Sequence, residues 1–288
     1  MKKTFFTVLC VLGVGLMACT SDEPETALNV GLMADTTGVE PVTISFDCQE
    51  VTISPMTRST IAESASRLDV WIYESGSEVT SVHQSSSDVG FGSVSLILNK
   101  TKTYTLYAIA HKATAACTLI DGIISFPDDK PKESFFYTTT FSPASTNNIN
   151  AEMNRICGKF TMTTTDAVPA EVDHVKFIIK NTALRYGVDG TLANITDRVV
   201  DFANLTRKND GTISFSFNIL STSDVATNFE IITTAYASDN SIVETKTFAS
   251  IPIRNNYRTT LSGAFFTSSS MSVTFTASDW NDYETIIF

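Results

Sequence analysis

The chain has 288 residues with a formal net charge of −11, and its 43% of hydrophobic residues are enough to bury a core. The acidic balance argues against a nucleic-acid partner, because affinity for a phosphate backbone comes from clustered Lys and Arg. Ser and Thr supply 72 residues and Phe another 19, a composition that favours β-structure.

The N-terminus carries an export signal. Lys2 and Lys3 precede a largely apolar run over residues 5–16, which is too short to span a bilayer, since a membrane helix needs about 20 residues. Residues 1–18 are therefore predicted to be a signal peptide. The closing Leu-Met-Ala-Cys resembles the lipobox of lipoprotein signal peptidase, which predicts a diacylglycerol on Cys19. An ordinary signal peptide followed by a chance cysteine is the alternative.

Residues 19–41 are polar and acidic, and we expect a linker there. Its first part, residues 20–25, resembles the signal that sends Bacteroidetes lipoproteins to the cell surface, although a solvated tether fits equally well. Acyl chains on Cys19 would anchor the protein to the outer membrane without a transmembrane helix. The triplet Asp35-Thr36-Thr37 resembles an O-glycosylation acceptor of the same bacteria.

Three cysteines remain after Cys10 is removed and Cys19 is lipidated, namely Cys48, Cys117 and Cys157. An odd number excludes a fully paired disulfide framework. We expect buried free thiols, with one bridge as the alternative, and the spacings do not match a zinc site.

Alternation of apolar and polar residues dominates from residue 42 onward, and it predicts an all-β protein. Helical spacing is weak and limited to 192–207 and 113–120. An acidic, Pro-containing stretch suggests a boundary near Asn150, giving an N-terminal β-sandwich at 42–150 and a C-terminal one at 151–288. Strands are expected at 42–46, 51–53, 68–73, 93–98, 103–110, 134–141, 158–165, 172–180, 212–220, 228–237, 243–251, 258–266 and 272–277. In the last of these, Val273 and Phe275 should share one buried face.

Residues that carry chemistry are sparse. His83, His111 and His174 each lie beside strand-like sequence without a metal-ligand spacing, so we expect half-exposed strand residues. No nucleophile elbow or phosphate-binding loop occurs. We therefore expect no catalytic, metal or cofactor site and no enzymatic activity.

Two carboxylate pairs and two aromatic residues have an alternative interpretation. Asp128-Asp129 and Asp279 with Asp282 could serve acid–base chemistry, but without a positioned partner they are more simply loop charges. Trp280 and Tyr283 could face a sugar, although aromatic residues that close a strand usually belong to a core or an interface.

The order of several motifs is more informative than any one of them. The lipobox and acidic linker precede a strand at 42–46, the segment Met56-Thr57-Arg58-Ser59, strands at 68–73 and 104–110, the block at 155–160 and the block at 251–263. This succession resembles the fimbrillins of Bacteroidetes, the lipoprotein precursors of type V pilus subunits. The resemblance covers essentially the whole chain through loose motifs.

The resemblance implies two transthyretin-like β-sandwich domains and no enzymatic activity. Fimbrillins are cut after an arginine by a trypsin-like protease, which releases the first strand, and a strand of another subunit then fills the groove. Arg58 matches that arginine, with Ser59 as the new N-terminus, and Arg67 is a second candidate in the same polar stretch. A solvated loop residue is the simpler interpretation of Arg58.

The leading hypothesis is thus a structural subunit of a surface fimbria that supports adhesion, with other pilus subunits as partners. The alternating segment 272–288 would be the strand that it donates. A stand-alone surface lipoprotein that binds glycans or host ligands is the alternative. A hydrolase built on a β-sandwich would require a carboxylate pair in a cleft.

Overall fold

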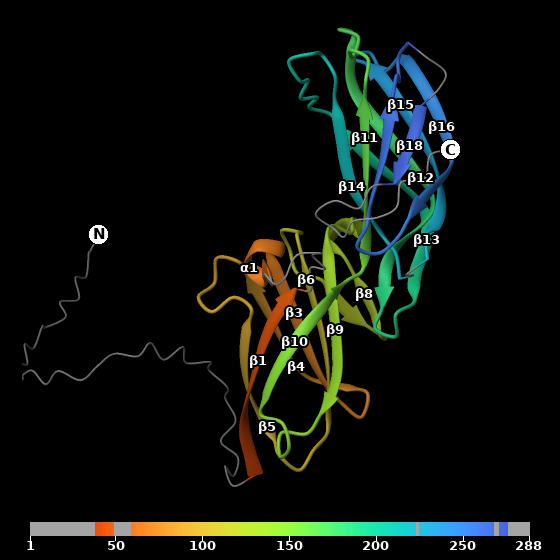
Figure 1. Cartoon of the computed structure of the whole chain (residues 1–288). Helices are drawn as coiled ribbons and strands as arrows, with labels where there is room; N and C mark the ends of the chain where they lie inside the picture. Colours follow the sequence, from red (N-terminus) through yellow and green to blue (C-terminus); the bar gives the residue numbers. More distant parts are fainter. Residues whose placement is uncertain (1–37, 49–58, 223–224, 268–270, 276–288) are drawn as a thin grey trace, which may run out of the picture. The chain divides into compact units, whose positions relative to one another are not determined.

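The computed structural model describes residues 38–48, 59–222, 225–267 and 271–275, which are mostly β-strand (Figure 1). Beside the strands, this part of the chain contains a four-residue helix α1 (Ile61–Ser64) and a 3-10 turn at Pro127–Asp129. The predicted all-β class is confirmed. None of the helices in the described ranges is long and apolar enough to cross a membrane.

The first sheet is built from the N-terminal half of the chain. Its order is β2-β1-β10-β9-β6-β3-β4, and β5 also pairs with β1. The strands are β1 (Val39–Cys48), β2 (Ser59–Thr60), β3 (Arg67–Glu74), β4 (Ser77–Ser85), β5 (Ser93–Asn99), β6 (Tyr104–His111), β9 (Ser134–Phe141) and β10 (Asn148–Arg155).

This sheet folds over itself because β10 changes partner along its length. Residues 148–153 of β10 pair with β1, whereas only Asn154 and Arg155 pair with β9. One layer therefore contains β1, β5 and β10, and the other contains β9, β6, β3 and β4. The apolar side chains of both layers form one buried cluster, which we call the first core; it includes Val42, Ile44, Phe46, Leu68, Val70, Leu106, Phe135 and Met153.

The second half of the chain adds two further sheets. The four-stranded one has the order β14-β11-β17-β18, and the other has the order β16-β15-β12-β8-β7 with β13 on β12. Their strands are β7 (Thr118–Ile120), β8 (Ile123–Ser125), β11 (Cys157–Thr164), β12 (Val172–Gly187), β13 (Leu192–Phe202), β14 (Ser214–Leu220), β15 (Thr227–Ala237), β16 (Ile242–Ile253), β17 (Arg258–Gly263) and β18 (Met271–Phe275). The second core between them is rich in phenylalanine, with ring centroids of Phe177 and Phe215 5.2 Å apart.

A third buried cluster, the junction core, joins strands of both halves. Strand β12 pairs with β15 along its first half, and its last residues, Arg185–Gly187, pair with β8. The β7–β8 hairpin thereby extends the second-half sheet although it comes from the first half of the chain. The members of the junction core include Trp71, Ile109, Phe136, Leu119, Ile124, Phe126, Ile156, Tyr186 and Leu220.

The helices suggested by the weak spacing at 192–207 and 113–120 are not observed in the described residues. Residues 192–202 form β13, which pairs with β12 from Leu192 to Phe202, and 113–120 contains the short strand β7. The apolar residues Ile195 and Val199, four apart, mimic a helix, but both are 55% exposed, so they mark no buried helical face. Pairing with β12 overrides the local spacing.

Two further differences concern the strand list and the domains. The prediction missed β4 and β10, and the strand expected at 51–53 lies outside the described residues. The division into 42–150 and 151–288 stays a prediction, with β10 continuing past Asn150 to Arg155.

Candidate functional site

Strand β1 occupies a slot between two other strands. Residues 43–48 pair in parallel with β10, and residues 39–45 pair antiparallel with β5 (Figure 1). Among the described strands, β5 has no sheet partner except β1. The first strand therefore holds β5 on the sheet, and its loss would leave two unpaired strand edges.

The slot is apolar on one face because the side chains of β1 alternate. Val42 and Ile44 are fully buried and Phe46 is 2% exposed, whereas Thr43 between them faces outward. Ile44 lies opposite Ile149 of β10 and Val94 of β5. Strands β5 and β10 thus contribute to the first core together with β1.

Near the C-terminal end of β1, the backbone of Gly92 lies close to that of Phe46. The Phe46 amide donates a hydrogen bond of 2.8 Å to the Gly92 carbonyl oxygen. Gly92 has a φ of +89°, and a Cβ added there would lie 2.3 Å from the Cγ2 atom of Ile61. Only glycine satisfies both conditions, so this position helps to fix where β1 ends.

The predicted cleavage site lies at the border of the described residues. Arg58 is outside them, but Ser59 begins β2 and pairs with Cys48, the last residue of β1. Arg67 belongs to β3 and pairs with Ser85 on one side and His111 on the other. Cys19 and residues 19–37 of the predicted linker lie outside the described residues, whereas residues 39–41 belong to β1, so the linker prediction is wrong for those three residues.

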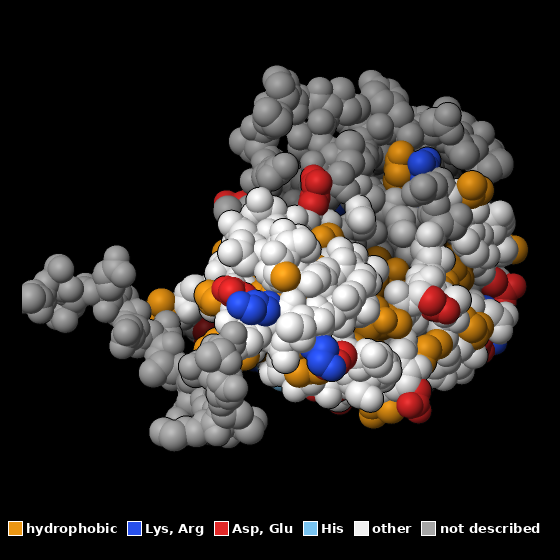
Figure 2. Space-filling view, turned by 90° about the horizontal axis from the view of Figure 1, so that it is seen from below, with side chains coloured by type: hydrophobic (Ala, Val, Ile, Leu, Met, Phe, Trp, Pro, Cys, Tyr) orange, Lys and Arg blue, Asp and Glu red, His pale blue; other side chains and the backbone are white. Residues whose placement is uncertain are grey.

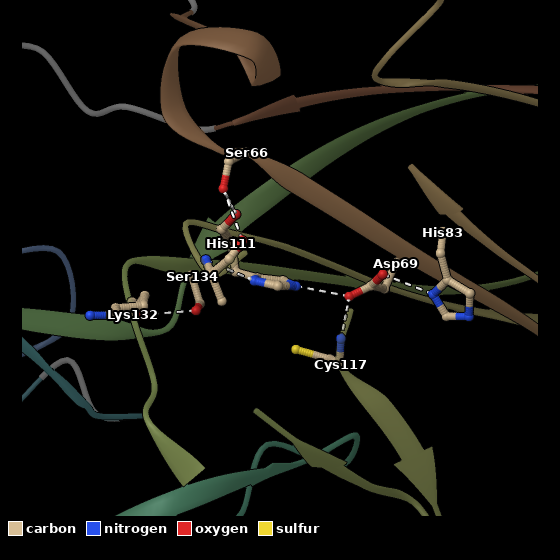
Figure 3. A network of polar contacts seen from close by, with 8 residues as sticks. Ser66, Asp69, His83, His111, Cys117, Lys132 and Ser134 are labelled. Atoms are coloured by element: carbon tan, nitrogen blue, oxygen red, sulfur yellow. Dashed lines mark hydrogen bonds and ion pairs between the residues drawn. The ribbon is translucent and has the colours of Figure 1, made fainter. Parts of the chain in front are cut away.

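A polar network centred on the buried Asp69 carboxylate links strands β3, β4 and β6 (Figure 3). The Asp69 carboxylate contacts His83 Nδ1 through Oδ1 at 2.8 Å and His111 Nε2 through Oδ2 at 2.8 Å. The Cys117 backbone amide also donates to Oδ2, at 2.7 Å. Asp69 and His111 are 0% exposed. The network thereby ties β3, β4 and β6 to the segment that enters the β7–β8 hairpin.

The donor atoms of Asp69, His111 and Cys117 lie within 4.8 Å of one another, a spacing that a metal ion could use. The hydrogen bonds argue against this use. The Ala113 amide donates to His111 Nδ1 at 3.2 Å, so Nδ1 carries no proton and Nε2 donates its own to Asp69. A metal on Nε2 would need that nitrogen deprotonated, leaving an imidazolate. Burial also raises the pKa of the Cys117 thiol, which disfavours the thiolate ligand.

Among the described residues singled out from the sequence, His174 and Asp129 both have structural partners. His174 is buried, stacks on Tyr236 with centroids 4.9 Å apart and contacts the Asp173 carboxylate at 3.1 Å. Asp129 pairs with Arg185 at 3.1 Å and is thus a loop charge. Residues 279–283 are outside the described part.

Two expectations about buried side chains have opposite outcomes. Cys117 and Cys157 are free and buried, as predicted. The expectation of half-exposed histidines is wrong for His111 and His174, because His111 bonds the buried Asp69 and His174 stacks on the partly buried Tyr236. On the face drawn in Figure 2, acidic and basic side chains, some of them adjacent, and apolar side chains are scattered over a surface formed mostly by other groups.

Solved structures show which fold the chain shares. An adhesin candidate from Bacteroides thetaiotaomicron aligns with a TM-score of 0.56 at 9% identity, over 86% of this chain and 99% of that chain. The fimbrial anchor protein Mfa2 from Porphyromonas gingivalis gives 0.52 at 12% identity, over 84% and 99%. A candidate polysaccharide-binding protein from B. thetaiotaomicron gives 0.51 at 10%, over 86% and 95%. The chain has the fold of these Bacteroidetes proteins, which confirms the fimbrillin-like resemblance at the level of the fold.

The sequence itself gives the family. The chain belongs to the family of unknown function DUF6562, whose model matches residues 35–285. No curated protein matches the chain in sequence.

Proposed function

We propose that this protein is an adhesion-supporting subunit of a surface fimbria, assembled by protease-triggered strand exchange. Its two parts, 42–150 and 151–288, would be transthyretin-like domains, and lipid on Cys19 would hold the precursor at the outer membrane. The observation that carries the proposal is the position of β1 as the strand that joins β5 to β10. The fold shared with a fimbrial anchor protein and an adhesin candidate supports it.

Cleavage between Arg58 and Ser59 would cut the covalent link between β1 and the rest of the domain. The strand would then be held only by its ladders and its buried side chains. Val42, Ile44 and Phe46 are almost fully buried, and each such side chain is worth about 1.5–3 kcal/mol. Against a typical domain stability of about 5–15 kcal/mol, an empty slot is costly, which favours a replacement strand.

Arg58 is a better protease site than Arg67 for a structural reason. A trypsin-like protease binds its substrate in an extended form with the backbone accessible. Arg67 is paired in β3 with strands on both sides, so cleavage there would require the sheet to open. On the Arg58 side, the first described element is β2, which contains just two residues.

The partner would be another subunit that inserts a strand between β10 and β5. Such β-augmentation satisfies the two exposed backbone edges and fills the apolar face at the same time. We propose that the segment 272–288 is the strand this subunit donates in turn. A stand-alone glycan-binding lipoprotein would need neither cleavage nor a donated strand.

The proposal is tested by limited trypsin digestion of the mature chain, followed by N-terminal sequencing and size-exclusion chromatography. We expect a product that begins at Ser59 and forms oligomers, no such product from Arg58→Ala, and normal cleavage of the matched variant Arg58→Lys. A cleaved protein that remains a stable monomer at high concentration would overturn the assembly mechanism. Fatty-acid labelling that is lost in Cys19→Ala would support the lipid anchor.

A further inference from the structure

Two tyrosines lie next to each other on the first sheet, where the junction core gives way to solvent. Tyr73 of β3 and Tyr107 of β6 are both partly exposed, and their ring centroids are 5.6 Å apart in an edge-to-face arrangement. Both pack against the junction core, which includes Trp71. Neither phenol makes a hydrogen bond within the described part of the chain. Because a tyrosine hydroxyl in a partly buried position usually has a partner, these two phenols suit an external ligand.

Threonines extend the same face beside the tyrosines. Thr138 of β9 lies opposite Tyr107, and Thr105 of β6 lies opposite Tyr73. The hydroxyl oxygens of Thr105 and Thr140 are 3.4 Å apart. Neighbouring strands are about 4.8 Å apart, so β3, β6 and β9 place these rings and hydroxyls on a strip about 10 Å wide. We call Tyr73, Tyr107, Thr105, Thr138 and Thr140 the tyrosine face.

Two carboxylates border the tyrosine face. Glu78 of β4 lies opposite Tyr73, and Asp121 lies in the turn between β7 and β8. Burial raises the pKa of the Tyr73 phenol, and charge repulsion from Glu78, Tyr107 and Asp121 raises it further. Both carboxylates are thus close enough to act on Tyr73. Within the described residues, neither of them is paired with a cation.

This set of groups fits a neutral sugar. The negative face of a tyrosine ring attracts the polarised C–H groups of a pyranose. Carboxylates accept hydrogen bonds from sugar hydroxyls, and threonine hydroxyls both donate and accept. The charges of Glu78 and Asp121 disfavour an anionic ligand such as a uronic acid. A basic side chain of a partner protein would use the carboxylates but would leave the threonine hydroxyls without a role.

We propose that the tyrosine face binds a short neutral oligosaccharide. The inference rests on the proposed adhesion-supporting function and names the class of ligand that adhesion would use. It does not depend on strand exchange. Strands β3, β4, β6 and β9 and the β7–β8 hairpin all follow Arg58 in the chain, so cleavage there leaves them covalently joined.

Binding of the uncut mature chain to an array of neutral and acidic oligosaccharides tests the proposal, with isothermal titration of the best neutral trisaccharide to follow. We expect neutral compounds to bind and trigalacturonic acid not to bind. Tyr107→Ala should weaken binding about ten-fold or more, as loss of an aromatic anchor does. The matched control, Tyr236→Ala, removes a partly exposed tyrosine from β15 and should bind normally.

Two milder variants keep the test decisive if Tyr107→Ala folds poorly. Asp121 has a φ of +49°, which Asn tolerates, so Asp121→Asn removes the charge and keeps the turn. Thr138→Val keeps a β-branched side chain and removes the hydroxyl. Each should weaken binding about two- to ten-fold, as loss of one hydrogen bond does, without changing the melting temperature.

Three outcomes would overturn the proposal. The first is that no neutral compound on the array binds, and the second is that all variants bind equally well. The third is binding of polylysine alone, lost in Asp121→Asn, which would show a basic protein partner instead. Saccharide binding by a chain that fails to assemble after trypsin cleavage would support this site while refuting the assembly mechanism, so the two proposals fail separately.

Discussion

The packing of β1 can be tested by removing one side chain from its buried face. Ile44 is 0% exposed and lies between Ile149 and Val94 on the neighbouring strands. Truncation of a buried Ile to Ala costs about 2–5 kcal/mol, because the lost transfer free energy is joined by the cost of a cavity. We expect Ile44→Ala to lower the free energy of unfolding of the first core by that amount.

The matched control is Thr43→Ala, one residue away on the exposed face of the same strand. Its effect should stay below about 1 kcal/mol, the span of β-propensity. Urea denaturation followed by fluorescence measures both, because buried Trp71 lies on β3 in the same sheet. Equal losses in the two variants would refute the assignment of Ile44 to the buried face and the strand slot with it.

Three other predictions follow from described contacts. Asp69→Ala should lower the free energy of unfolding by about 2–5 kcal/mol, since it leaves the His111 and Cys117 donors unsatisfied. Added Zn²⁺ should not raise the melting temperature of the native protein, because His111 Nε2 donates its proton to Asp69. Burial raises the pKa of Asp166, but hydrogen bonds from the amides of residues 265–267 lower it below its usual value of about 3.8. The contribution of Asp166 to the free energy of unfolding is therefore complete at neutral pH. It disappears as the pH falls from about 3.8 through the lowered pKa. In thermal denaturation, Asp166→Asn should lower the free energy of unfolding by about 1–3 kcal/mol at pH 7 and by less at pH 3. Cys157, whose pKa is raised by burial to about 12, and Cys117 should react with a thiol reagent only after unfolding, and rapid labelling of the native protein would contradict their burial.

Local alternation predicted most strands because a half-buried strand repeats every two residues. Strand β9 was predicted with its observed bounds, 134–141, and β3 and β15 differed by a residue at one or both ends. Strand β4 was missed because it lies at the edge of its sheet and none of its residues is fully buried, so its sequence carries little alternation of burial. Strand β10 does alternate, but it lies where the acidic, Pro-containing stretch suggested a domain boundary near Asn150.

The buried network could not be predicted because its parts are distant in sequence. His83 is 14 residues from Asp69, and His111 is 42 residues from it. The register of β3 against β4 places His83 opposite Asp69, and that register depends on tertiary pairing. An aspartate inside the apolar run 68–73 was the one local indication, since a charged residue is rarely buried without a partner.

The sequence predicted that the first strand is buried, but not that it lies between β5 and β10. Its apolar face follows from the alternation of Val42, Ile44 and Phe46, and the structure agrees. That β5 depends on β1 for its place in the sheet could not be predicted, because it follows from which strands are neighbours in space.

The central claim is that β1 is a replaceable strand, and competition for its slot tests this most directly. The mature chain is cut at Arg58 with trypsin and mixed with a fluorescent synthetic peptide of residues 39–48. The account predicts that the peptide binds the cut protein, does not bind the uncut protein or Arg58→Ala, and blocks oligomer formation. A peptide carrying Ile44→Asp should fail to bind, since it would bury an unpaired charge. Oligomers that form equally well with the slot filled by the peptide would contradict the account.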